Sequence, residues 1–357
     1  MKRKAFFNIF FIFSLIFLIS CKKESVEKYD IEFFNTFDTV THIIIYDSDS
    51  KRANKELETM HNRFNELHKI YDKYNDYEGL NNLKTINDNA GIEPVKVDKE
   101  LFYLIEYSLD SYKNISNKTN IAMGPVVDTW NKYRELYEAG KTKEEVVELL
   151  GSEIPTKKEL DLSRQYLNVD DIVLNKEDQT VYLKKKDMQL DVGSVAKGYA
   201  TELVAKEAEE RGVKSEIISA GGNVRAIGGP IDRDYYSVAV QNPYKNSKEE
   251  KDFLTVLKIK GKSVVTSGDY QRYFKVDDKN YCHIIDPESL MPGNIYRSVS
   301  VITEDSLLCD YLSTSLFLMP YEEGRELADK LNVDVIWAFP NGEVKVTDGA
   351  KKLMVEQ

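Results

Sequence analysis

The sequence is poor in positive charge and in signs of a boundary between domains. Its 357 residues carry 49 Lys and Arg against 60 Asp and Glu, which gives a formal net charge of −11 at pH 7. That balance argues against nucleic-acid binding, because nucleic acid needs a basic protein surface. No Pro/Gly-rich linker, internal repeat or low-complexity tract divides the chain. We therefore expect a single α+β domain with two lobes, built from mixed or antiparallel sheets with flanking helices.

Cysteine is also scarce, with three in the whole chain. Cys21 lies near the start, whereas Cys282 and Cys309 lie in the last quarter. The last two are candidates either for a disulfide or for small buried residues, and the sequence does not decide between these states. The P-loop and the G-x-G-x-x-G fingerprint are both absent, so an anionic ligand must be bound by a metal, a helix N-terminus or single lysines.

A run of apolar residues long enough to span a membrane is missing as well. The longest run, residues 5–20, follows a basic start and is shorter than the roughly 20 residues that a stable span needs. A basic start followed by a short apolar core is typical of a secretory signal. Leu18, Ser20 and Cys21 resemble the lipobox of bacterial lipoproteins, in which the cysteine thiol receives diacylglycerol before cleavage.

These features predict the organisation of the N-terminal part. We expect a lipoprotein signal peptide over residues 1–20, a lipid on Cys21, a polar tether over residues 21–32 and one domain over residues 33–350. An uncleaved anchor helix is the alternative, and it also exports the rest of the chain. We therefore expect the protein outside the cytoplasm, anchored to a bacterial membrane on the outer face of the cell membrane or on the periplasmic side.

Several segments rich in Gly, Ser, Thr and Asp lie between hydrophobic runs. In residues 191–200 (DVGSVAKGYA), a strand leads through Gly193 and Ser194 directly into a helix. Such a turn offers free backbone N–H groups and the positive end of a helix dipole, which suits phosphate, and Lys197 can add a charge. The alternative is a glycine packed against a strand beside a solvated lysine.

Two further segments contain candidate metal-binding or catalytic residues. Asp310 and Thr314 lie four residues apart in a predicted helix over residues 305–318, so their oxygens share one face and can form part of a Mg²⁺ site. The alternative is that such a pair is exposed on the protein surface and binds no metal. His283 precedes the turn signal Asp286–Pro287, where a histidine serves either as a general base or as a structural residue.

Six segments of this kind occur in a fixed order along the chain. They are NIAMGP (120–125), DVGSVAKGYA (191–200), SAGGNVRAIGG (219–229), VVTSGDYQRYF (264–274), HIIDPESLMP (283–292) and CDYLST (309–314). Together they resemble the motifs of the ApbE family, the FAD:protein FMN transferases, in the family's own order. The resemblance runs from about Phe33 to Val346 and therefore covers nearly the whole chain after the predicted signal.

The resemblance implies a role for each matching position. Contacts with FAD are implied for Phe37, Tyr74, Thr119, Asn120, Asp191, Lys197 and Ile285. Metal contacts are implied for Ser194, usually through a backbone oxygen, and for the side chains of Asp310 and Thr314. His283 matches the histidine proposed to activate the acceptor hydroxyl. Phe37 stands in place of a common Met and Asn120 in place of a common Asp. These differences leave open how the rings of FAD are contacted, but they do not change the implied reaction.

The implied reaction is the Mg²⁺-dependent transfer of FMN from FAD to a Thr or Ser hydroxyl of another protein, with release of AMP. FAD is then a substrate, and the implied acceptors are exported or membrane-facing electron-transfer proteins. Two alternatives stay open. In one, water replaces the hydroxyl and FAD is hydrolysed to FMN and AMP. In the other, the protein is a lipoprotein that binds flavin without chemistry.

Overall fold

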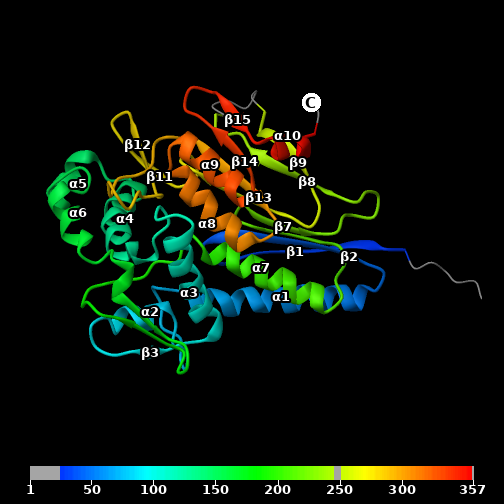
Figure 1. Ribbon diagram of the computed structural model, residues 1–357, viewed down its shortest axis with the longest axis horizontal. Coiled ribbons are helices and arrows are strands. Elements are labelled where there is room, and N and C mark those ends of the chain that lie inside the picture. The colour runs from blue at the N-terminus through cyan, green and yellow to red at the C-terminus, as the bar shows by residue number, and fades with distance from the viewer. Residues whose placement is uncertain (1–24, 245–250, 356–357) are drawn as a thin grey trace, which may run out of the picture.

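The computed structural model describes residues 25–244 and 251–355, and Figure 1 shows it as a ribbon. The predicted signal peptide and Cys21 lie outside the described residues, so both stay predictions. Within the described ranges, no helix is long and apolar enough to cross a membrane.

An antiparallel sheet of eight strands forms the centre of the molecule (Figure 1). In β2, buried Thr41, Ile43 and Ile45 alternate with more exposed residues, as expected for a strand that packs one face on a core. In spatial order the strands are β1 (Glu27–Thr36), β2 (Thr39–Asp47), β6 (Glu216–Ala220), β7 (Asn223–Ile227), β10 (Ser263–Gly268), β13 (Ser298–Thr303), β14 (Asp334–Ala338) and β15 (Val344–Val346).

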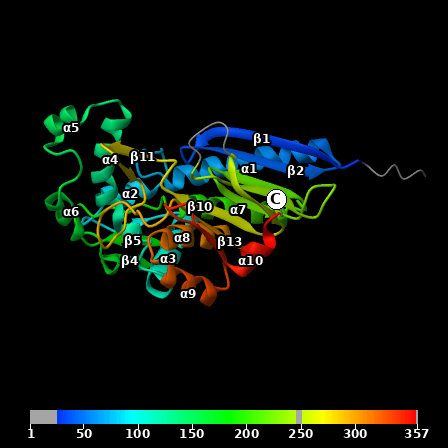
Figure 2. The same ribbon diagram turned by 90° about the horizontal axis from the view of Figure 1, so that it is seen from above.

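Helices cover one face of this sheet and a hairpin covers the other (Figures 1 and 2). The helices are α1 (Ser50–Tyr71), α7 (Ala196–Glu210) and α8 (Ser306–Phe317), which contact β1 and β2, β6 and β7, and β10 and β13 respectively. On the opposite face, the hairpin of β8 (Tyr236–Gln241) and β9 (Phe253–Ile259) joins α10 (Asp348–Leu353) around a separate core. Both faces of the sheet are therefore largely buried.

A smaller lobe stands at one end of the sheet, at the left of Figure 1. It combines α4 (Gly124–Glu138), α5 (Lys143–Leu150) and α6 (Lys157–Arg164) with the hairpin of β11 (Tyr273–Val276) and β12 (Lys279–Cys282), and it has its own core. The remaining elements are α2 (Leu83–Asp88), α3 (Lys99–Asn114), α9 (Tyr321–Leu331), the small sheet of β3 (Val95–Lys96), β4 (Ile172–Asn175) and β5 (Thr180–Leu183), and two 3₁₀ turns at Ile121–Met123 and Val169–Asp171. This arrangement confirms the expected α+β class with two lobes.

Two strands differ from the expectation. Strand β1 begins at Glu27, inside the segment 21–32 that the sequence predicts as a polar tether, so residues 27–32 belong to the sheet instead. Tyr29, Ile31 and Phe33 pack against the main core, but the charged residues between them hide this alternation in the sequence. Strand β7 follows directly after the glycine pair of the SAGGNVRAIGG segment, where the sequence analysis expects no strand.

Candidate active site

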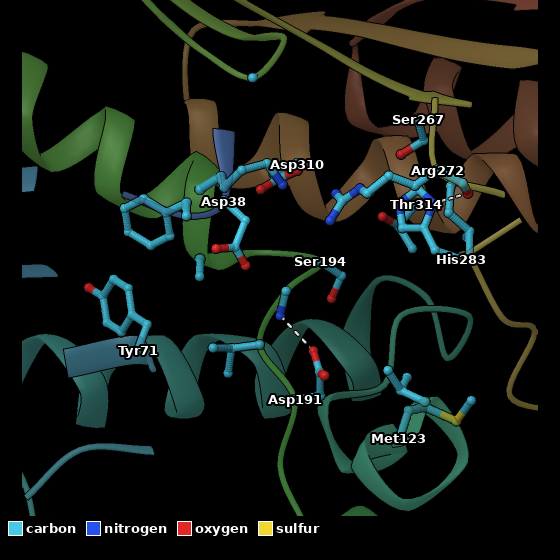
Figure 3. Close-up of a pocket in the computed structure, with 18 of the residues that line it drawn as sticks. Asp38, Tyr71, Met123, Asp191, Ser194, Ser267, Arg272, His283, Asp310 and Thr314 are labelled. Atoms are coloured by element: carbon cyan, nitrogen blue, oxygen red, sulfur yellow. Dashed lines mark hydrogen bonds between the residues drawn. The ribbon is translucent and has the colours of Figure 1, made fainter. Parts of the chain in front are cut away.

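A cavity of about 300 Å³ lies where the small lobe meets the helices and the end of the central sheet, and Figure 3 shows its lining. That volume is typical of the small end of ligand-binding pockets. Every site residue expected in the described part of the chain lines this cavity. They are Phe37, Tyr74, Thr119, Asn120, Asp191, Ser194, Lys197, His283, Ile285, Asp310 and Thr314. The fold thus brings together segments that lie far apart in the sequence.

The cavity has two chemically different ends, and Figure 3 shows Tyr71 and His283 on opposite sides of it. We call the polar end the group formed by Ser194, Lys197, Arg272, His283, Asp310 and Thr314. We call the aromatic end the group formed by Phe37, His68, Tyr71 and Tyr74. Met123, Val127 and Ile285 add apolar surface to the lining.

The polar end is built on the contact between α7 and α8. The backbone N–H of Gly198, in the first turn of α7, donates to Oδ2 of Asp310 on α8 at 2.8 Å. A Cβ atom at position 198 would lie 2.4 Å from the backbone oxygen of Ser306, so only glycine lets the two helices approach this closely. This close approach places the Asp310 carboxylate at the start of α7.

The start of α8 is fixed by a buried carboxylate of α7. Oε2 of Glu202 accepts the backbone N–H of Ser306 at 2.7 Å and Nε of Arg225 at 3.2 Å. A negative charge at a helix N-terminus satisfies free N–H groups and interacts favourably with the helix dipole. Glu202 therefore holds the helix that carries Asp310 and Thr314.

Burial and neighbouring charges act in opposite directions on the ionisable groups of the polar end. Burial raises the pKa of the Asp310 carboxyl, while Lys197 and the Gly198 N–H act against that rise. Burial lowers the pKa of Lys197, while Asp310 acts against that fall. The side-chain amide of Asn223 is buried beside Asp310 and helps to lower the pKa of that carboxyl. Buried groups of opposite charge thus line this end of the cavity, which suits a site that takes a charged ligand.

An ion-pair network that the sequence analysis missed lines another wall. Nζ of Lys73 lies 2.7 Å from Oδ1 of Asp128 and 2.8 Å from Oδ2 of Asp191. The other oxygen of Asp191 accepts the backbone N–H of Gly193 at 2.9 Å. Burial opposes ionisation of Asp191, but the charge and hydrogen bond of Lys73 outweigh it and hold the pKa below its usual value. Asp191 is thus ionised and orders the turn that leads to Ser194.

His283 directly follows the last residue of β12 and lies just before the turn at Asp286 and Pro287. Its backbone N–H donates to the carbonyl oxygen of Arg272 at 3.2 Å, and its ring Nδ1 lies 3.1 Å from the same oxygen. Because a carbonyl only accepts, Nδ1 carries the proton and Nε2 keeps its lone pair. Burial and then the charge of Arg272 lower the pKa of His283 to about 3. The ring is therefore neutral at neutral pH.

Arg272 is a second residue that the sequence analysis did not single out, although it lies in the VVTSGDYQRYF segment. Its guanidinium lines the cavity, and the described part of the chain gives its side chain no hydrogen bond or ion pair. Burial and Arg134 lower its pKa, whereas Asp38 acts in the other direction. Because a guanidinium stays charged in proteins, an unpaired one in a cavity indicates an anionic ligand.

Thr119 and Asn120 line the cavity, but neighbouring protein groups already bind their polar atoms. Oγ1 of Thr119 donates to the carbonyl oxygen of Tyr311 at 3.1 Å. The amide of Asn120 donates to the Leu167 carbonyl at 2.9 Å and accepts the Ala122 N–H at 2.8 Å. A ligand contact at these two positions is thus left to the backbone and to the apolar surface of the side chains.

With this geometry established, comparison with known proteins identifies the family. The model of the ApbE family matches residues 37–337, which is most of the chain.

The chain belongs to the ApbE family.

Curated relatives and solved structures extend this ApbE match. The FAD:protein FMN transferase of Klebsiella pneumoniae (strain 342) is 30% identical over 261 residues, which cover 72% of this chain and 75% of that protein. The FAD:protein FMN transferase of Haemophilus influenzae is 25% identical over 350 residues, covering 95% and 94%.

The fold is also that of solved ApbE structures. The ApbE protein of Thermotoga maritima superposes with a TM-score of 0.77 at 23% identity, covering 92% of this chain and 100% of that one. The flavin transferase ApbE of Vibrio cholerae superposes with a TM-score of 0.74 at 20% identity, with the same coverage.

The donors that an ApbE member would use for Mg²⁺ fit that ion chemically. Asp310 and Thr314 present a carboxylate and a hydroxyl one turn apart on α8, and Ser194 lines the same cavity. Mg²⁺ prefers such oxygen donors and usually keeps water or phosphate oxygens as further ligands. The described ranges contain no group of three or more His, Cys, Asp or Glu side chains that could hold a metal, so water and substrate would complete the coordination.

Proposed function

We propose that this chain is a Mg²⁺-dependent FAD:protein FMN transferase that uses the polar end of the cavity. The observation that carries the proposal is the meeting of three features in one cavity: a neutral histidine, a guanidinium that has no ion pair among the described residues, and the Asp310–Thr314 pair. Support also comes from the curated relatives that carry this name, because their match to this chain covers most of their length.

In the proposed reaction, the oxygen of a Thr or Ser hydroxyl attacks the phosphorus of the FMN half of FAD. A new P–O bond to the acceptor forms, the pyrophosphate P–O bond breaks, and AMP leaves. Lys197 and Arg272 bind the anionic pyrophosphate, and the Asp191-ordered turn orients it at the start of α7. Mg²⁺, when bound by Asp310, Thr314 and the Ser194 carbonyl, supplies neutralisation of the charge on the phosphates.

His283 accepts the proton of the attacking hydroxyl at Nε2. Its hydrogen bond to the Arg272 carbonyl fixes the tautomer that leaves this nitrogen free. Burial and Arg272 hold the ring neutral, so no proton blocks Nε2 at neutral pH. Bound pyrophosphate brings negative charge beside Arg272 and Lys197, which makes protonation of the ring easier once the substrate is in place.

The proposal includes an address and an acceptor class. Residues 1–20 and Cys21 support export and a lipid anchor, which would place the enzyme at the outer face of a bacterial membrane. FMN would then be added to exported or membrane-facing electron-transfer proteins. Loss of membrane association after Cys21→Ser, with activity kept, is the expected result. Unchanged lipid labelling of the variant would contradict the anchor.

Asp310→Ala tests the enzyme itself. We expect FAD to bind while Mg²⁺-dependent AMP release falls below detection, because the buried carboxylate of the cation site is lost. The matched control is Asp329→Ala, which removes an exposed carboxylate of α9 that pairs with Arg325 on the same helix. If wild type releases no AMP with Mg²⁺ and an acceptor, the protein only binds flavin.

His283→Ala tests the base. Transfer to the acceptor should be abolished while the affinity for FAD stays nearly intact, since the ring acts on the acceptor rather than on the flavin. His42→Ala is the control, because His42 pairs with Asp30 at the sheet edge. Unchanged transfer in His283→Ala would remove His283 from the mechanism. AMP release without labelled acceptor in wild type would instead favour FAD hydrolysis.

A further inference from the structure

Two hairpin turns lie side by side at the cavity, and both have positive φ at their two central residues. The turn between β1 and β2 has φ of 54° at Phe37 and 50° at Asp38. The turn between β6 and β7 has φ of 56° at Gly221 and 93° at Gly222. Positive φ at both positions is the type I′ pattern of two-residue hairpin loops. The N–H of Gly221 donates to the carbonyl of Val40 at 2.9 Å, so the two hairpins are in contact.

The two turns differ in how easily their residues adopt positive φ. Glycine adopts positive φ freely, whereas a bulky residue such as Phe does so rarely and with strain. Strain of this kind persists only where the surroundings hold it, and it gathers at ligand-binding sites. Phe37 and Asp38 both line the cavity. A glycine pair there would relieve the strain but leave the aromatic end without the Phe37 ring.

His68 of α1 contacts the strained turn at both its backbone and its side chain. The backbone N–H of Phe37 donates to Nδ1 of His68 at 3.3 Å, which requires the tautomer protonated at Nε2. The Phe37 ring meets the His68 ring edge-on, with centroids 5.6 Å apart. Phe64 and Tyr71, on the same helix, contact the Phe37 ring at 6.5 and 6.3 Å between centroids.

We propose that His68 is a positioning residue that holds the strained Phe37–Asp38 turn, so that the Phe37 ring forms a wall for one of the two ring systems of FAD. The inference rests on the proposed function, because it takes FAD as the ligand. His68 acts through Phe37 and has no part in proton transfer. Its loss should therefore weaken FAD binding and leave the chemical step at saturating FAD nearly unchanged.

Three variants separate this role from a general effect on folding. His68→Leu removes the acceptor, whereas His68→Asn offers an amide oxygen in place of Nδ1. His61→Leu is the matched control, because His61 lies on the same helix and its Nε2 lies 3.5 Å from Asn35 outside the cavity lining. We expect His68→Leu to raise the Kd for FAD about tenfold, the size of one hydrogen bond with its packing. His68→Asn should restore most of the affinity, and His61→Leu should match wild type.

The split between binding and rate distinguishes positioning from destabilisation. A partly unfolded variant would lose maximal AMP release in proportion to the inactive fraction and keep its Kd. His68→Leu should do the reverse, with maximal AMP release within about twofold of wild type. An unchanged Kd in His68→Leu, or equal losses in the Leu and Asn variants, would overturn the proposal.

A double-mutant cycle covers the case in which His68→Leu folds poorly. Phe37→Gly relieves the backbone strain and removes the ring, so it should fold and bind FAD more weakly. In this background, His68→Leu should raise the Kd by less than about twofold. The backbone N–H at position 37 remains, but the ring through which His68 acts on FAD is gone. Fully additive effects would contradict the coupling between His68 and the turn.

Binding of FMN and of AMP, measured separately, identifies the ring system. The affinity of one of the two should fall in His68→Leu, and the affinity of the other should stay as in wild type. If neither falls, Phe37 forms no ring wall and the inference is wrong. If wild type binds FAD and releases AMP while His68→Leu is indistinguishable from it, only this inference is lost. If wild type binds no FAD, the proposed function is lost and the inference with it.

Discussion

The polar and aromatic ends of the cavity are held in place by different means. At the polar end, the Gly198 backbone touches α8 directly, and Glu202 fixes the start of that helix. At the aromatic end, a strained turn depends on one side-chain hydrogen bond, and the Tyr74 ring is 61% exposed. Backbone contacts leave little freedom, whereas side-chain contacts allow adjustment. The difference matches a site that must place phosphate and metal donors precisely but only needs to cover a flat ring.

The largest effect should come from Gly198→Ala, which attacks the backbone contact of the polar end. The new Cβ would meet the Ser306 oxygen at 2.4 Å and Cβ of Asp310 at 2.5 Å, so α8 must move. We expect AMP release to fall about 100-fold or more, since displacement of a catalytic group by about 1 Å has effects of that order. Gly324→Ala in α9 is the control, because its nearest neighbour is the flexible Leu316 side chain at 3.3 Å. Full activity in Gly198→Ala would show that the polar end is not rigid.

Lys73→Met should have the next largest effect, because it leaves Asp128 and Asp191 without their shared cation. We expect a loss of about 2 kcal/mol in the free energy of unfolding, below the 3–5 kcal/mol of fully buried pairs because Asp128 is partly exposed. The KM for FAD should also rise, since Asp191 no longer orders the phosphate turn. Urea unfolding and steady-state kinetics measure these effects, with Lys69→Met in the last turn of α1 as the control. If Lys73→Met has the free energy of unfolding and the KM of wild type, Lys73 neither stabilises the fold nor orders the phosphate turn.

Tyr74→Ala should have a smaller effect, confined to the aromatic end. The exposed ring contributes little to folding, so stability should change by no more than about 0.5 kcal/mol. If the ring packs on the cofactor, as the family resemblance implies, the Kd for FAD should rise about threefold to tenfold. Titration with FAD measures this change. A Kd equal to that of wild type would show that Tyr74 does not contact the cofactor.

The smallest effect is expected in a pH titration of the His283 ring. Burial and Arg272 lower the pKa of His283 to about 3, so the ring should stay neutral between pH 8 and pH 5. Its NMR resonances, assigned by comparison with His283→Gln, should not shift over this range. In the unfolded chain the ring takes up a proton near pH 6.5, so its contribution to stability is full above that pH and falls toward pH 3. A titration midpoint near pH 6.5 for His283 in the folded protein would contradict its role as a neutral base.

The sequence was informative where the chemistry is local. The Asp310–Thr314 pair lies within one helix, and the turn at residues 191–200 leads into the start of α7, so one stretch of sequence contains each pattern. The strand expected before that turn is absent from the described residues, because β5 ends at Leu183. Lys73 was missed because its partners lie 55 and 118 positions away, and no local pattern marks such a contact. Arg272 was missed as a site residue because what distinguishes its side chain is the lack of a hydrogen bond or ion pair within residues 25–244 and 251–355.

Two further differences have the same physical origin. The Phe37–Asp38 turn carries no glycine or asparagine, and although Asp38 tolerates positive φ, the Phe37 before it gives no sign of this shape. Contacts with another element, His68 and the aromatic rings of α1, explain how the shape is held. Strand β1 was partly assigned to a tether because its charged residues face outward at the edge of the sheet. In each case tertiary contacts decide a structure that local sequence leaves open.

Transfer of FMN is tested most directly by counting its two products. Purified protein is incubated with FAD, Mg²⁺ and an exported electron-transfer protein, and AMP and the mass of the acceptor are measured together. We predict equal amounts of AMP and of acceptor carrying FMN on a Thr or Ser hydroxyl, and neither product with Asp310→Ala. AMP formed without labelled acceptor, or no AMP at all, would contradict transfer as the function of this cavity.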